Sequence, residues 1–172
     1  NDAIHMVFPL KGFTFKWYDQ MIHSSRLHKA LMNSIKVGLV ASVFSTFIAL
    51  LAAKAFTRYK VRFHQLSYGA ILLPFVIPEI IIAVALIVIW TGMGFQLGLV
   101  PVTISHILFC TPFCLLILIS RMEGFDKNLE EAAMDLGENA WGTFWRVTFP
   151  LVLPAVIASL LLSFVISFDE FI

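Results

Sequence analysis

Three acidic side chains lie in or beside strongly apolar stretches of the sequence: Glu79, Asp169 and Glu170. An ionised side chain at the centre of a bilayer costs about 3 kcal/mol, so such residues are candidates for a function. Carboxylates attract cations, and Glu79 is therefore a candidate for the lining of a cation path. Glu79 also follows Pro78, and the alternative is a protonated or hydrogen-bonded glutamate that stabilises a kink. Asp169 and Glu170 are candidates for the same path, or else simply cap the end of an apolar helix.

Other reactive side chains give no catalytic pattern. Ser105 and His106 are adjacent, so on a helix they point in different directions and cannot form a nucleophile–base pair. We interpret His106 as a residue that hydrogen-bonds between helices. Cys110 and Cys114 are four residues apart in an apolar run, and we interpret them as small buried residues rather than a disulfide or metal pair. The sequence therefore predicts no catalytic residue and no metal site.

The composition excludes several classes of protein. Of the 172 residues, 59% are hydrophobic and 13% are charged, whereas a soluble domain has about 45–50% apolar and about 25% charged residues. The mean hydropathy is +0.89. A net charge of only +1 argues against a nucleic-acid-binding protein. The chain is therefore expected to be a membrane protein.

Four apolar runs are long enough to cross a bilayer, near residues 35–53, 66–91, 101–120 and 151–170. Within a bilayer, runs of this length hydrogen-bond their backbone N–H and C=O groups by forming helices. The sequence therefore predicts an all-α, polytopic transmembrane bundle. Pro74 and Pro78 predict a kink or local unwinding in the second run, where a straight helix would place Glu79 about 20 Å from its start. Residues 1–32 would form an external segment, and a small excess of Lys and Arg favours a cytoplasmic location for 54–65 and 121–150.

The segment 121–150 has the pattern of a helix–turn–helix outside the membrane. Asp126 is a candidate N-cap, Gly137 is placed to end the first helix, and a second helix would begin near Asn139 and end at Pro150. One apolar stripe follows helical spacing: Leu129, Ala132, Ala133 and Leu136. The hairpin either packs on its own bundle or offers this stripe to a partner.

The same segment resembles a family motif. Glu131-Ala132-Ala133, followed by Gly137 and then by Phe149-Pro150, is similar to the EAA loop of ABC-importer membrane permeases of the MetI-like, type-1 kind. In that family the loop forms a coupling helix in a cleft of a cytoplasmic ATPase. The resemblance implies ATPase coupling by Glu131, Ala132, Ala133, Gly137 and Pro150. One departure is Val147-Thr148-Phe149-Pro150, where the family commonly has Ile-x-Leu-Pro.

The resemblance extends over nearly the whole chain. Within the family, the chain most resembles the second membrane subunit of spermidine/putrescine importers. Further matching segments are Gly12-Phe13-Thr14, Asn33-Ser34, Pro78-Glu79-Ile80, Ser105-His106, Gly124-Phe125-Asp126 and Ser167-Phe168-Asp169-Glu170. Family members have six helices where four are visible here. We therefore expect residues 33–172 to be a partial type-1 transmembrane domain within a longer protein.

The resemblance also implies a function and partners. The chain would be a non-catalytic permease subunit in the cytoplasmic (inner) membrane of a bacterium, in contact with lipid and not with nucleic acid. It would bind no cofactor itself, because ATP and Mg would be held by a partner ATPase dimer; the sequence has no GxxxxGK[ST] run. A homologous permease subunit and an external binding protein would complete the importer. The alternatives are the same fold for a sugar, sulfate or iron, or an intramembrane enzyme, for which no GxSG-type run is present.

Overall fold

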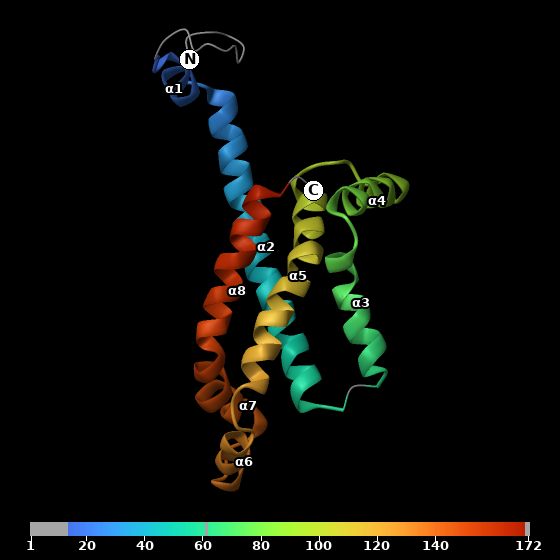
Figure 1. Cartoon of the computed structure of the whole chain (residues 1–172), viewed down its shortest axis with the longest axis vertical. Coiled ribbons are helices and arrows are strands. Elements are labelled where there is room, and N and C mark those ends of the chain that lie inside the picture. Colours follow the sequence, from blue (N-terminus) through green and yellow to red (C-terminus); the bar gives the residue numbers. More distant parts are fainter. Residues whose placement is uncertain (1–13, 61, 171–172) are drawn as a thin grey trace, which may run out of the picture. The chain divides into compact units, whose positions relative to one another are not determined.

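The computed structural model describes residues 14–60 and 62–170, and over these residues the expected all-helical fold is confirmed. Residues 1–13 of the expected external segment, with Gly12 and Phe13 of the family resemblance, lie outside the described residues, as do residues 61 and 171–172. The helical segments (Figure 1) are α1 (Lys16–Ile22), α2 (Ser25–Arg58), α3 (His64–Val76), α4 (Glu79–Gly92), α5 (Leu99–Glu123), α6 (Asn128–Asp135), α7 (Ala140–Thr143), the π-helical η1 (Phe144–Thr148) and α8 (Phe149–Asp169).

Three of the described helices are long and apolar enough to cross a membrane: α2, α5 and the continuous run Ala140–Asp169. A fourth span results if the bent pair α3 and α4 is taken as one. This count agrees with the four apolar runs of the sequence. The boundaries differ at α2, which runs on through Lys54 to Arg58, so these two basic residues lie on a helix and not in a loop.

The chain divides into two compact units, Asn1–Ile35 and Lys36–Ile172. The described part of the first unit contains α1 and the first turns of α2, and every one of its residues from 14 to 35 is exposed or half-buried. The second unit contains the packed helices and both candidate sites.

Small side chains form the contacts within the second unit. The buried face of α2 repeats at helical spacing, with Gly38, Ala41, Ser45, Ala49 and Ala53. On α8 the buried positions are Val152, Ala155, Ser159, Ser163 and Ser167. Both faces meet α5, where the Cys114 sulfur lies 3.7 Å from Ser45 Oγ and 3.7 Å from the Ser159 carbonyl oxygen. Small residues let helix backbones approach closely, which is how helices associate in a membrane.

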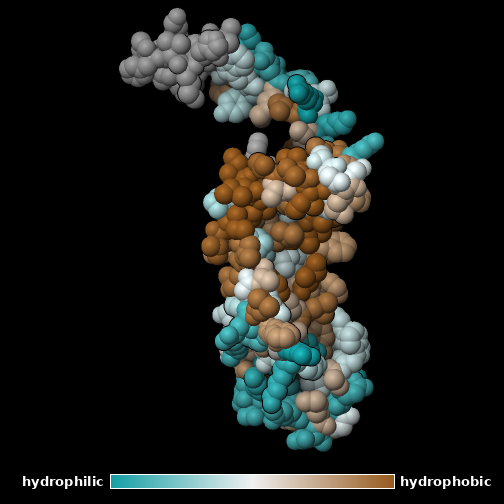
Figure 2. Space-filling view, turned by 90° about the vertical axis from the view of Figure 1, so that its right-hand side faces the viewer, coloured by the Kyte–Doolittle hydropathy of each residue, from teal (hydrophilic) through white to brown (hydrophobic). Residues whose placement is uncertain are grey.

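Large apolar side chains remain on the outside of this unit. Ile82 is the one buried residue of α4, while Ile80, Val84 and Val88 are more than half exposed. Figure 2 shows hydrophobic surface along the helices and hydrophilic surface at the end where α6 lies. A surface of this kind suits contact with lipid or with another membrane subunit.

The second apolar run is broken, as its prolines predict. The axes of α3 and α4 differ by 106°, and the break lies at Ile77 and Pro78, which have extended backbone angles. Pro78 lacks an N–H and restricts the residue before it, so a helix cannot run through this point without cost. Glu79 is consequently the first residue of α4, and the depth expected for it from a straight helix no longer applies.

The predicted end of the second hairpin helix at Pro150 is wrong. α7, η1 and α8 form one continuous helix, with Pro150 in the first turn of α8. The missing N–H of Pro150 disturbs the helix little, because the helix widens into a π-helical turn just before it. In that turn the N–H of Phe149 bonds to the carbonyl of Phe144, five residues back. The last span is therefore mechanically continuous with the hairpin.

Candidate functional site

The three acidic candidates of the sequence line one cavity. It has a volume of about 420 Å³ and is bordered by Glu79 at the start of α4 and by Asp169 and Glu170 at the end of α8. The other walls are apolar, and they include Phe109 and Phe113 of α5. Two elements that are far apart in the sequence thus bring their carboxylates to the same space.

A second cavity of about 260 Å³ adjoins the break between α3 and α4. It is lined by Pro74, Pro78 and neighbouring residues, and it shares Glu79, Phe109 and Phe113 with the first cavity. Glu79 therefore borders both spaces.

The chemistry of this lining suits an organic cation. Carboxylates attract ammonium groups, and aromatic rings such as those of Phe109 and Phe113 attract cations through their faces. Among the residues that the structure describes, no group of three or more His, Cys, Asp or Glu side chains is placed to hold a metal ion.

Buried hydrogen bonds hold the walls of the acidic cavity. His106 of α5 and Ser167 of α8 share a hydrogen bond of 2.8 Å between Nδ1 and Oγ, which confirms His106 as an interhelical residue. Ser105 points elsewhere: its hydroxyl donates to the carbonyl of Pro101 and accepts from the indole N–H of Trp90 at 3.1 Å. The two cysteines are buried and unbridged, as expected.

The hairpin of residues 121–150 forms with defined helix ends. Gly137 adopts a positive φ of 96°, and the N–H groups of Gly137 and Glu138 bond to the carbonyls of Met134 and Ala133, which close α6 as predicted. Asn139 caps α7 by accepting the N–H of Gly142 at 2.8 Å. The predicted N-cap at Asp126 is wrong by one residue, because Lys127 is the N-cap of α6. The Asp126 carboxylate accepts the N–H of Asn128 instead.

The apolar stripe of the hairpin is left uncovered by the residues that the structure describes. Leu129, Ala132 and Leu136 are exposed, and Ala133 is half-buried. Glu131 is exposed too, as is Pro150. Since the hairpin packs inward through other residues, the stripe and Glu131 remain available to a partner.

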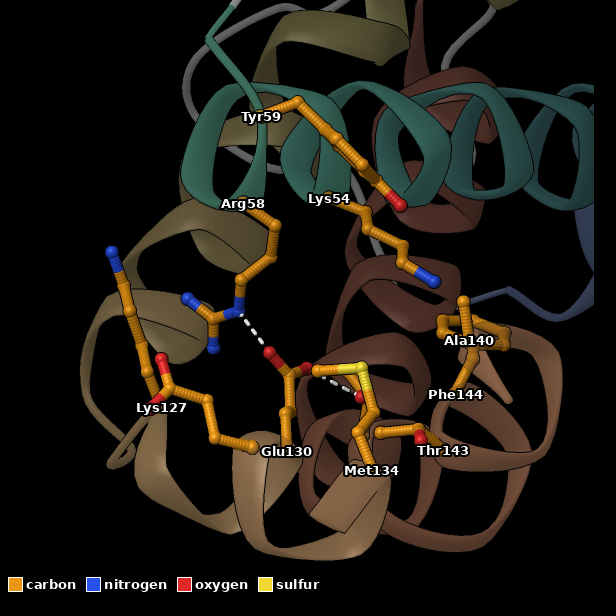
Figure 3. Close-up of a pocket in the computed structure, with 11 residues that line it drawn as sticks. Lys54, Arg58, Tyr59, Lys127, Glu130, Met134, Ala140, Thr143 and Phe144 are labelled. Carbon is orange, nitrogen blue, oxygen red and sulfur yellow. Dashed lines mark hydrogen bonds and ion pairs between the residues drawn. The ribbon is translucent and has the colours of Figure 1, made fainter. Parts of the chain in front are cut away.

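The inward side of α6 is formed by Glu130, which the sequence analysis did not single out. Its Oε2 accepts from Arg58 Nε at 2.5 Å and its Oε1 accepts from Thr148 Oγ1 at 2.5 Å (Figure 3). A cavity of about 340 Å³ borders the cluster, with Lys54 and Phe144 among its lining residues. The one sign in the sequence that a glutamate faces inward is the doublet Glu130–Glu131. Adjacent positions on a helix point about 100° apart, so the two side chains face different surroundings.

Known proteins with similar sequences are transport permeases. The family model described as "binding-protein-dependent transport system inner membrane component" matches residues 45–172. The spermidine/putrescine transport system permease protein PotC of Escherichia coli K12 is 35% identical over 160 residues, which cover 93% of this chain and 61% of that protein. PotC of Haemophilus influenzae is 33% identical over 93% of this chain and 62% of its own length. The putrescine transport system permease protein PotI of E. coli K12 is 26% identical, over 94% of this chain and 60% of its own.

These matches extend over most of the chain, and the chain spans about three fifths of the length of the curated relatives. The family match includes α5, the hairpin and α8, which contain most of both candidate sites. The chain therefore belongs to the family of binding-protein-dependent transport system inner membrane components and is a multi-pass inner-membrane protein.

Proposed function

We propose that this chain is the membrane-spanning subunit of an ATP-binding-cassette importer that carries spermidine and putrescine across the cytoplasmic membrane. The observation that supports this substrate class is the cavity shared by Glu79, Asp169 and Glu170. Relatives whose names specify spermidine and putrescine transport add to it. Protonated amines are attracted to such an acidic cavity, whereas sulfate would be repelled by it.

The proposed mode of binding follows from the placement of the charges. Polyamines carry protonated amines separated by flexible methylene chains, so they need carboxylates spaced along an apolar path. Glu79 would receive one ammonium group, and Asp169 with Glu170 would receive another. The rings of Phe109 and Phe113 would cover the methylene segment and add attraction to the charged ends.

The energy for transport would come from a partner. A cytoplasmic ATPase dimer would bind ATP and Mg and hold the hairpin at its exposed stripe, through Glu131, Ala132 and Ala133. Gly137 would fix the turn and Pro150 the start of α8. A homologous permease subunit would supply the other wall of the path, and an external binding protein would deliver the substrate.

The test is uptake of labelled spermidine and putrescine into vesicles that contain the complete permease, its sister subunit and the ATPase, with the binding protein added. ATP-dependent uptake of both polyamines, with no uptake of labelled sugar, sulfate or iron in the same vesicles, is the expected result. An assembly that hydrolyses ATP and moves one of those other solutes instead would overturn the substrate assignment.

A further inference from the structure

Arg58 and Glu130 form a buried ion pair between the end of α2 and the first turn of α6. Their side chains are 9% and 11% exposed, and Arg58 Nε lies 2.5 Å from Glu130 Oε2. The other carboxylate oxygen accepts from Thr148 Oγ1, also buried, at 2.5 Å. Each oxygen of Glu130 therefore has its own donor, one from α2 and one from η1 just before α8 (Figure 3).

Arg58 makes two more contacts that draw a further helix into the cluster. Its Nη2 donates to the carbonyl oxygen of Met122 in the last turn of α5, at 3.1 Å. Its guanidinium carbon lies 4.7 Å from the centre of the Phe125 ring, in the link between α5 and α6. The ends of α2, α5 and the continuous α7–η1–α8 helix thus all meet the hairpin at one charge pair.

The electrostatics of the pair favour its persistence. Arg58 is the last residue of α2 and Glu130 lies in the first turn of α6, where the helix ends favour a positive and a negative charge respectively. Separation of the pair would leave a charge buried without its partner, which is costly. A force applied to α6 is therefore expected to move the attached helix ends before it separates Arg58 from Glu130.

We propose that Arg58, Glu130 and Thr148 form a latch that transmits displacement of the hairpin to α2 and α8 together. This inference rests on the proposed docking of the hairpin on an ATPase. The two adjacent glutamates then have different tasks: Glu131 is exposed toward a partner, and Glu130 is turned inward to the span helices. All three latch residues are positioning residues, since they act on the transport path through the helices that they join.

The experiment uses the full-length permease with its sister subunit, ATPase and binding protein in vesicles, and measures polyamine taken up per ATP hydrolysed. Glu130→Gln removes the charge, and Thr148→Val removes one hydrogen bond with little change of shape. Glu123→Gln, at an exposed glutamate of α5, is the matched control. A coupling free energy of ordinary size predicts a loss of uptake per ATP of at least about fivefold in Glu130→Gln.

A merely structural role would lower the amount of assembled importer and leave uptake per ATP unchanged. The latch predicts the reverse: ATPase still co-purifies and hydrolyses ATP, while transport falls. Thr148→Ser keeps the hydroxyl and is expected to retain more uptake per ATP than Thr148→Val. The charge exchange Arg58→Glu with Glu130→Arg is expected to recover part of the uptake per ATP that Glu130→Gln loses. Parental uptake per ATP in both Glu130→Gln and Thr148→Val would overturn the latch. A parent assembly that fails to bind the ATPase would instead overturn the proposed function.

Discussion

His106 Nδ1 and Ser167 Oγ lie 2.8 Å apart in the buried contact between α5 and α8. His106 precedes Phe109 on one helix, and Ser167 precedes Asp169 on the other. The hydrogen bond therefore fixes the separation of an aromatic wall and an acidic wall of the same cavity.

Loss of this hydrogen bond should loosen the helix pair. Ser167→Ala is expected to lower the stability of the detergent-solubilised protein by about 0.6–2 kcal/mol, the range measured for hydrogen bonds between membrane helices. Thermal unfolding of the purified protein measures the change. Ser120→Ala, at an exposed serine of α5, is the control and should behave as the parent. Equal effects of the two substitutions would show that the buried hydrogen bond does not stabilise the pair.

Small residues at the helix contacts should not tolerate enlargement. Ala155 is buried on α8 and packs in the cluster that includes Cys114 and Leu118, whereas Ala158 on the same helix is exposed. Ala155→Leu is expected to cost about 1–3 kcal/mol through overpacking, and Ala158→Leu close to nothing. The yield of monodisperse protein and its unfolding temperature provide the measurement. A larger loss for Ala158→Leu would mean that α8 buries a different face.

The turn of the hairpin should depend on Gly137 through its backbone angle. Apart from its chain neighbours, no described residue has an atom within 4 Å of a Cβ built at Gly137, but its φ of +96° disfavours any side chain. Gly137→Ala is therefore expected to cost about 1–2 kcal/mol. Gly98 has equal space and an extended φ of −179°, so Gly98→Ala serves as the control. Protease cleavage within residues 121–150 should rise in Gly137→Ala alone, and equal cleavage in both variants would contradict the prediction.

A charge on the exposed stripe should impair docking. Ala132→Asp places a carboxylate on the surface that we propose to lie against the ATPase, and co-purification of the ATPase should fall about tenfold or more, which corresponds to about 1.4 kcal/mol. Ala133→Asp is expected to act in the same direction, although Ala133 is half-buried. The control Ala132→Asn adds a side chain of the same size at the same exposed position without the charge. Unchanged ATPase recovery with Ala132→Asp would refute docking at this stripe.

Much of the fold could be predicted from the sequence, because hydrophobic runs and turn residues act locally. Helices over the four apolar runs, the Gly137 helix end and a helix start near Asn139 all appear where their residues indicate. Pro78 also predicted a break, but no local pattern fixes an angle of 106° between α3 and α4. That angle depends on how both helices pack against α5.

The sites could be predicted only in part, for a related reason. Single acids in apolar runs were visible, and the structure places Glu79 with Asp169 and Glu170. Glu130 was missed because its partners Arg58 and Thr148 come from distant segments, and an acid beside another acid resembles an ordinary exposed pair. The continuous helix through Pro150 was missed because a π-helical turn before a proline leaves no sequence pattern that we used.

The central claim is that the cavity lined by Glu79, Asp169 and Glu170 binds polyamines during transport. It is tested most directly by spermidine uptake kinetics of the complete importer with Glu79→Gln, Asp169→Asn or Glu170→Gln. Asp19→Asn, at an exposed acid of α1, is the control. We expect kcat/KM to fall at least about tenfold in the cavity variants, the equivalent of about 1.4 kcal/mol, and to be unchanged in the control. Parental kcat/KM in all three cavity variants, in assemblies that still hydrolyse ATP, would contradict the account.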